Sequence, residues 1–340
     1  MRPKEYRIKE LLREKGLDGA IVSSPENFHY VTGFGGHQHT VSRQPGFTLA
    51  VMRADDKVPT HLTTMDFEAA TFRIKAAGLN FVVDPYDTWV GLKTWDEIAH
   101  GAVVPDKTAM ESSMDKLVQF MKACDLADKK VGVELDYLPV PYYKSLTEKF
   151  PEAEFVDISD LFVYARSVKQ PDEIEMFRNL CRIADHGFTE VSKIAKIGVS
   201  ERELSQCFRE DVIKSGFCAP SSWSMFSTGP SSARLTLPGD GVVKDGDVVK
   251  FDAGVNAEFD FYTTDTSRAW IIGNGDPALL KLKDRLYEGQ RRMIAAAKPG
   301  LPINELYHTA YDYVKEMFPC YRRGHQGHSI SMGPATAEAP

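Results

Sequence analysis

The sequence predicts a two-domain chain whose first half is an α/β layer structure, and three observations support this. The chain has 340 residues, which is enough for two separate apolar cores. In its first half, short apolar runs alternate with amphipathic helical stretches. From about residue 170 this alternation gives way to long helices and a strand hairpin. We therefore expect one domain over residues 1–165 and a second over residues 166–340.

Short apolar runs bounded by turn residues predict five strands in the first half, at residues 19–22, 47–52, 81–83, 131–135 and 155–158. Apolar residues at helical spacing predict helices at residues 3–15, 66–76, 112–127 and 141–149. We expect the segment Ser-Ser-Pro-Glu-Asn at 23–27 to break the first strand. We expect the glycine-rich segment 33–40 to form a loop.

The second half should begin with a helix at Pro171, because proline suits the first turn of a helix. Ser200 and Glu203 form a capping box ahead of a second helix. Residues 245–270 then show a strand pattern on both sides of a turn, which predicts a hairpin. Two further helices are expected, at residues 277–299 and 303–317.

Composition excludes several classes of protein. The net charge is −7 and the basic residues are scattered, which argues against a nucleic-acid partner. The five cysteines include no C-x-x-C pair, so we expect free thiols in a reducing compartment. The N-terminus is charged and no run of 18 apolar residues occurs, so we expect no membrane span and a cytoplasmic location.

Two aspartates in the predicted hairpin are the first candidates for chemistry. Asp252 stands between Phe251 and Ala253 in an apolar strand, and Asp265 stands among threonines on the return strand. A carboxylate beside an apolar core costs several kcal/mol unless a partner neutralises it, and two nearby carboxylates repel each other. One bound cation would solve both problems, and oxygen ligands suit Mn, Mg, Zn or Co.

A structural interpretation competes with this one. Asp252 could cap the turn before Gly254, and Asp265 could pair with Arg268. Most aspartate pairs in proteins have roles of that kind. A third group favours the metal site, because His325 and His328 lie in a glycine-flanked segment that follows the hairpin, and glycine allows a backbone to approach a metal closely.

These motifs resemble those of a known family. Phe-Asp-Ala-Gly at 251–254, Thr-Asp-Thr-Ser-Arg at 264–268 and Gly-His-Ser-Ile at 327–330 resemble the catalytic signature of the aminopeptidase P, prolidase and methionine aminopeptidase superfamily. Residues 17–34 resemble the start of a creatinase-type N-terminal domain, and residues 165–175 resemble its junction with the catalytic domain. The resemblance covers nearly the whole chain, with the motifs in the expected order.

The resemblance implies a fold and a site. The N-terminal domain would be a small mixed-sheet α/β domain. The second would be an α+β pita-bread domain with a curved antiparallel sheet. It would hold two divalent ions, drawn from Mn, Co, Zn or Fe, through two Asp, one His and two Glu. Carried over, Asp252 would bind one ion, Asp265 would bridge both and His328 would bind the other. A metal-bridged hydroxide would attack the scissile bond of an Xaa-Pro peptide or an amide-like substrate, and the family favours a homodimer.

Four departures from the family pattern bear on this. The sequence ends at Pro340, before the two Glu ligands, so we expect an incomplete catalytic domain. The Asp252–Asp265 spacing is roughly two residues longer than usual, which preserves the alternation of strand side chains. Thr236 and Ala337 stand where the family's peptidases carry two auxiliary histidines. Neither side chain moves protons near neutral pH, and His325 could substitute in part or be a surface residue.

Two alternative functions follow from those departures. One keeps the fold and changes the chemistry, because the family includes creatinase, which works without metal, and a sulfonium-compound lyase. The other is a metal-free binding protein, as some members of the superfamily have lost their metals. Substitution of Asp252 by Asn separates these interpretations, since a binding module would keep its function and a metalloenzyme would lose most of its activity.

Overall fold

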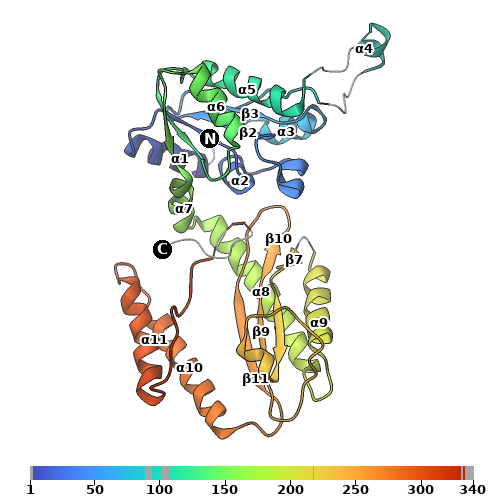
Figure 1. The fold of residues 1–340 in the computed structure, drawn as a ribbon, viewed down its shortest axis with the longest axis vertical. Helices are drawn as coiled ribbons and strands as arrows, with labels where there is room; N and C mark the ends of the chain where they lie inside the picture. Colours follow the sequence, from blue (N-terminus) through green and yellow to red (C-terminus); the bar gives the residue numbers. More distant parts are fainter. Residues whose placement is uncertain (1–2, 89–93, 102–106, 217, 331, 334–340) are drawn as a thin grey trace. The chain divides into compact units, whose positions relative to one another are not determined.

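A computed structural model of the chain describes residues 3–88, 94–101, 107–216, 218–330 and 332–333 (Figure 1). The chain divides into two units, Met1–Val168 and Lys169–Pro340, each with its own β-structure. Within the described ranges no helix is both long enough and apolar enough to cross a membrane. All five cysteines are free thiols.

A six-stranded mixed sheet forms the centre of the first unit, in the order β4-β3-β2-β1-β5-β6. Its central strand β1 pairs antiparallel with β2 and parallel with β5. The strands are β1 (Gly19–Val22), β2 (Leu49–Arg53), β3 (Thr60–Thr63), β4 (Phe81–Val83), β5 (Lys130–Val133) and β6 (Glu154–Asp157). The five predicted strands are confirmed to within a few residues. β3 was missed because its sequence, Thr-His-Leu-Thr, has no apolar run.

Helices pack around this sheet and complete the predicted α/β layers. They are α1 (Pro3–Glu14), α2 (Pro25–Thr32), α3 (Ala69–Ala76), α5 (Ala109–Ala123), α6 (Val140–Lys149) and α7 (Ser159–Ser167). The short helix α4 (Trp95–Ala99) has no buried residue and projects away from the sheet (Figure 1). Leu117 and Phe120 of α5 and Tyr142 of α6 are buried in one core cluster with Ile21 and Val131 of the sheet. Such burial of large apolar side chains is the main source of stability for a domain of this size.

The segment expected to break the first strand is instead the start of helix α2. Ser24 is its N-cap and accepts a hydrogen bond from the backbone N–H of Asn27, and Pro25 occupies the first turn. Gly33 ends the helix in the left-handed conformation, with φ of 79°. The buried carboxylate of Glu134 accepts hydrogen bonds from Ser24 and Asn27, so this helix start is also fixed by a residue far away in the sequence.

The predicted loop at 33–40 was also partly wrong, because a π-helical turn forms at Gln38–Ser42. Its His39 is buried, and the ring meets Phe28 edge-on with centroids 5.3 Å apart. The Nε2 atom of His39 donates to the carbonyl of Ser23 at 2.8 Å. Burial lowers the pKa of His39 from 6.5 to about 4, so the ring is neutral in the folded protein near neutral pH.

The second unit is built on an antiparallel sheet in the order β11-β9-β8, with a separate pair β10-β7. Its strands are β7 (Cys218–Pro220), β8 (Met225–Thr228), β9 (Val248–Ala253), β10 (Val255–Ala257) and β11 (Thr266–Ile271). Its helices are α8 (Pro171–Ile194), α9 (Glu201–Lys214), α10 (Pro277–Ala296) and α11 (Ile303–Met317). The predicted hairpin and the four predicted helices are confirmed, and α10 and α11 pack on each other (Figure 1).

An aromatic cluster joins α8 and α9 to one face of this sheet. Phe188 of α8 stacks on Phe208 of α9 with centroids 5.2 Å apart, and Phe208 meets Phe226 of β8 at 5.5 Å. Phe226 in turn meets Phe251 of β9 at 5.0 Å. Because side chains alternate along a strand, the neighbours of Phe251 point to the other face. The helices therefore cover one face of the antiparallel sheet, and Lys250 and Asp252 lie on the opposite face, in agreement with the α+β prediction.

Candidate metal centre

Asp252 and Asp265 lie on the same face of the sheet. In the β9–β11 pairing, Asp252 stands directly opposite Ser267, and Asp265 is two residues before Ser267. Directly opposed residues share a face, and the two-residue alternation of β11, continued to the residue just before the strand, brings Asp265 to the same face. The two aspartates are thus diagonal neighbours on the face that α8 and α9 do not cover.

The two carboxyl groups touch each other. A side-chain hydrogen bond joins Asp252 to Asp265, and the pKa of Asp252 is raised by burial first and by the charge of Asp265 second. Two carboxylates in contact cannot both be ionised without a compensating charge. A shared proton satisfies this requirement, and so does a cation.

His328 completes a row of three side chains. Its Nε2 atom lies 3.1 Å from Oδ2 of Asp265, and its Nδ1 atom donates to the carbonyl of Ser329 at 2.8 Å. The hydrogen bond at Nδ1 orients the ring so that Nε2 is the nitrogen that faces Asp265. Histidines that bind metals commonly have their second nitrogen held in this way.

The donor types suit a divalent cation, although the three groups do not form a compact cage. Two ligands of one ion, with bonds of about 2.1 Å, lie roughly 3 Å apart, which matches the Asp265–His328 separation of 3.1 Å. Within the described part of the chain, no group of three or more His, Cys, Asp or Glu side chains is arranged to hold a metal ion. Asp265 contacts both of the other candidates, and it is the centre of the arrangement.

Arg268 does not pair with Asp265, so this part of the structural interpretation is wrong. Arg268 stands opposite Phe251 in the β9–β11 pairing and points to the helix-covered face. There its guanidinium pairs with Asp185 of α8 at 2.7 Å and lies over the ring of Phe188. The three-residue offset between Asp265 and Arg268 places them on opposite faces.

Two cations that the sequence interpretation missed lie near the aspartates. Lys250 is two residues before Asp252 and on the same face, and its pKa is lowered by burial despite the nearby Asp252. Arg323 acts electrostatically on both Lys250 and Asp252, and its Nε donates to the carbonyl of His325. The alternation of Val-Lys-Phe-Asp along β9 could have revealed Lys250, whereas Arg323 gives no local signal.

Of the two positions that stand in place of the family's histidines, Thr236 lies within the described residues and Ala337 does not. Thr236 lies in the segment between β8 and β9, and its hydroxyl donates to the carbonyl of Leu237 at 3.2 Å. Ala337, and Glu338 beside it, lie outside the described residues.

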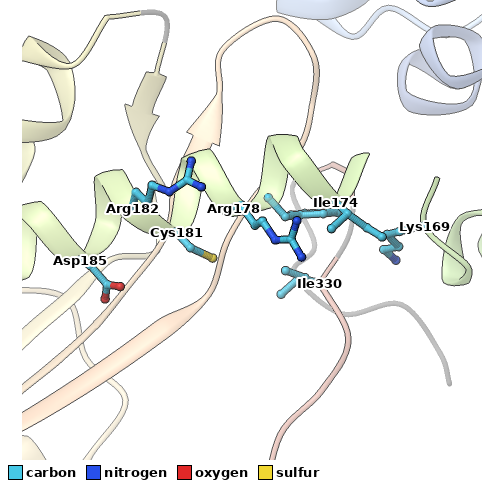
Figure 2. Close-up of a pocket in the computed structure, with 8 residues that line it drawn as sticks. Lys169, Ile174, Arg178, Cys181, Arg182, Asp185 and Ile330 are labelled. Carbon is cyan, nitrogen blue, oxygen red and sulfur yellow. The ribbon is translucent and has the colours of Figure 1, made fainter. Parts of the chain in front are cut away.

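A groove of about 430 Å³ follows α8 but belongs to no candidate site. Arg178, Cys181 and Arg182 line it together with Ile330 (Figure 2). Charged side chains of this groove form ion pairs within the protein: Arg182 pairs with Glu175 at 3.5 Å, and Asp185 pairs with Arg268. None of the three candidate ligands is among the lining residues.

Two protein-family models match the chain in the order of the two units. The model of the creatinase/prolidase N-terminal domain matches residues 6–168. The model of metallopeptidase family M24 matches residues 175–337.

Curated relatives and solved structures agree with these matches. An uncharacterised peptidase of Bacillus subtilis, YqhT, is 24% identical over 96% of this chain and 81% of its own. An Xaa-Pro dipeptidase of Lactobacillus delbrueckii subsp. lactis is also 24% identical, with the same coverage. The solved Xaa-Pro dipeptidase from Bacillus anthracis superposes with a TM-score of 0.78, at 23% identity, over 99% of this chain and 83% of that one. These likenesses support the expected fold, an α/β domain followed by a pita-bread domain.

Proposed function

Because the chain belongs to metallopeptidase family M24 and carries a creatinase/prolidase N-terminal domain, we propose that it is a metal-dependent hydrolase of short Xaa-Pro peptides. The relatives named Xaa-Pro dipeptidase, in Lactobacillus delbrueckii and Bacillus anthracis, support this choice of substrate. At 23–24% identity, they support it as a class of reaction and leave the preferred first residue open.

The observation that carries the proposal is the contact of Asp265 with both Asp252 and His328 on one open face of the sheet. A cation would compensate the two carboxyl groups in contact, and the imidazole of His328 beside them offers a nitrogen ligand for it. Arg268 of β11 does not compensate this charge, because it is engaged on the opposite face, and the nearby cations are Lys250 and Arg323.

Each of the three residues has a distinct part in the proposed site. Asp252 and His328 would each bind one ion, and Asp265, between them, would bridge two. Divalent ions of Mn, Co, Zn or Fe would polarise the scissile carbonyl and lower the pKa of water. The hydrogen bond from His328 Nδ1 to Ser329 would keep the ring oriented, with Nε2 toward Asp265.

A metal-binding titration and a hydrolysis assay test this proposal. The purified chain is titrated with Mn²⁺, Co²⁺ and Zn²⁺ by calorimetry, and its metal content is measured after purification in metal-containing buffer. The metal-loaded protein is then assayed on Ala-Pro, with Ala-Gly as the comparison. A chain that binds none of these ions would contradict the proposal, and so would a metal-loaded chain that cleaves neither dipeptide.

Thr236 favours one second candidate, a non-peptidase enzyme on the same fold. A threonine in place of an imidazole removes a group that could donate a proton to a leaving amine. The substrate would then be an amide-like or related small molecule. Binding of metal without cleavage of any Xaa-Pro dipeptide would favour this candidate over the first.

A further inference from the structure

One buried carboxylate, that of Glu201, holds both ends of a loop. Glu201 is the first residue of α9 and is 2% exposed. Its Oε1 accepts hydrogen bonds from the backbone N–H of Thr228 at 2.9 Å and from the hydroxyl of Ser231, and its Oε2 accepts from the N–H of Gly239 at 2.7 Å. These donors lie at the beginning and end of residues 229–240, which we term the 229–240 loop.

The chain around Glu201 is shaped to admit this carboxylate. The backbone N–H of Glu201 donates to the carbonyl of Gly241 at 2.8 Å. A Cβ atom on Gly241 would lie 2.7 Å from Oε1 of Glu201, which is closer than atoms can approach without displacement. Glycine at 241 therefore allows the side chain of Glu201 to lie against the end of the loop.

The middle of the loop is attached to the face of the sheet that carries Asp252. The Nζ atom of Lys250 donates to the carbonyl of Arg234 at 2.9 Å, and Lys250 is two residues from Asp252 on the same face. Ser227 stands directly opposite Lys250 and has no exposed surface, which fits a loop lying over this part of the face. The 229–240 loop thus lies beside Asp252.

The loop presents apolar side chains that are not used for packing. Leu235 is 78% exposed and Leu237 is 61% exposed. A loop with its leucines in solvent is not held by an apolar core, so its position depends on polar contacts, namely the hydrogen bonds of Glu201 and Lys250 and the exposed ion pair of Arg202 with Asp240. Apolar side chains beside a few convergent polar groups are typical of a site that binds a small ligand.

We propose that Glu201 is a positioning residue, which fixes the 229–240 loop beside Asp252 so that Leu235 and Leu237 receive an apolar side chain of the substrate. This inference rests on the proposed hydrolase function and adds a substrate feature to it. The pyrrolidine ring of proline is one such apolar group.

Limited trypsin digestion of the whole chain tests the first half of the inference. Trypsin cuts after Arg234, and cleavage of a loop requires that the loop opens. Glu201→Gln replaces one acceptor oxygen with an NH₂ group that faces N–H donors. We expect trypsin to cleave the Arg234–Leu235 bond of the Glu201→Gln variant roughly tenfold faster, or more, than that of the unchanged chain. Mass spectrometry of the digest over time measures the rate.

Glu203→Gln is the matched control, because Glu203 lies in the same first turn of α9 and its carboxylate accepts only from Ser200 among the described residues. Its cleavage after Arg234 should equal that of the unchanged chain. Lys250→Met is a second variant, in case Glu201→Gln does not fold, and it should also speed this cleavage. Equal cleavage in all of these chains would overturn the inference.

Enzyme kinetics test the second half of the inference, that the 229–240 loop receives an apolar side chain of the substrate. We expect Glu201→Gln to keep the Mn²⁺ affinity, because the candidate ligands are elsewhere, and to lower kcat/KM for Ala-Pro about tenfold or more through misplaced substrate. Faster cleavage after Arg234 with unchanged kcat/KM would overturn the positioning role. If the unchanged chain neither binds metal nor hydrolyses a dipeptide, the proposed function fails and the positioning role fails with it. The trypsin result then still decides whether Glu201 fixes the loop.

Discussion

Oδ2 of Asp265 lies 3.1 Å from Nε2 of His328, although the two residues are far apart in the sequence. Since Asp265 also touches Asp252, its carboxylate is the link between the other two candidate ligands. A site organised in this way should be more sensitive to the loss of Asp265 than to the loss of either neighbour.

We predict that Asp265→Asn weakens Mn²⁺ binding more than roughly 10- to 100-fold. A loss of that size is typical when a residue that only hydrogen-bonds to a metal ligand is replaced, and Asp265 is proposed to bind the metal itself. The amide cannot supply the negative charge that both proposed ions require. Calorimetric titration measures the effect. Arg268→Gln, on the same strand but facing α8, should leave the affinity unchanged. Similar losses in both variants would mean that general damage to the strand, and not the removal of a ligand, causes the effect.

We predict that Mn²⁺ raises the melting temperature of the chain and that Asp252→Asn removes this rise. A ligand that binds only the folded state stabilises it by about 2.7 kcal/mol at 100 times its dissociation constant. Thermal unfolding followed by circular dichroism, with and without Mn²⁺ and after chelation with EDTA, measures the shift. An equal shift in the Asn variant would show that the ion binds elsewhere.

We predict that stability falls between pH 6.5 and about pH 4 because of His39. Burial lowers the folded-state pKa of His39 from 6.5 to about 4, so the unfolded chain binds the proton first as the pH falls. The contribution is fully present above pH 6.5 and is lost toward pH 4. Its size is on the order of 3 kcal/mol.

Urea unfolding of a His39→Gln variant at both pH values measures this contribution. Glutamine can still donate to the carbonyl of Ser23 and does not titrate, so its stability should change less with pH than that of the unchanged chain. The control is His100→Gln, at an exposed histidine of the same unit. An identical pH dependence in the His39 variant and the unchanged chain would refute the assignment.

We predict that Glu134→Ala destabilises the first unit by about 3–5 kcal/mol. The carboxylate is buried and accepts from the hydroxyl and N–H of Ser24, the N–H of Ser23 and the amide of Asn27. Its removal leaves these donors without an acceptor at the start of α2. Glu148→Ala, at an exposed position of α6, should change the unfolding free energy by less than about 0.5 kcal/mol. Comparable losses in the two variants would contradict the prediction.

Local sequence signals were sufficient for most helices, because caps act within a single turn. Pro171 and the Ser200–Glu203 capping box marked the starts of α8 and α9 correctly. The start of α5 was placed three residues late because a second capping box, Thr108 with Glu111, was overlooked. The start of α2 differs from the prediction for another reason, since Ser24-Pro25 is an N-cap followed by a first-turn proline and not a strand breaker.

The candidate site shows where local reasoning stops. The shared face of Asp252 and Asp265 follows from the two-residue period of a strand. The approach of His328 to Asp265 depends on how a later segment returns to the sheet; the glycine-flanked histidines suggested that this segment takes part, and the family resemblance singled out His328. Glu201 was visible as an acidic residue in a helix first turn, but its partners at Thr228 and Gly239 are set by tertiary structure, which no local pattern encodes.

Both ends of the 229–240 loop are hydrogen-bonded to Glu201, and this arrangement bears on how the loop sequence can vary among related proteins. Both ends of the loop meet at Glu201, so the residues between them can change without altering the strands they connect. The entropy of closing a loop grows only slowly with its length, and insertions there should be inexpensive. With the proposed role of Leu235 and Leu237, exchange of this segment between homologues would change the substrate preference on an unchanged scaffold.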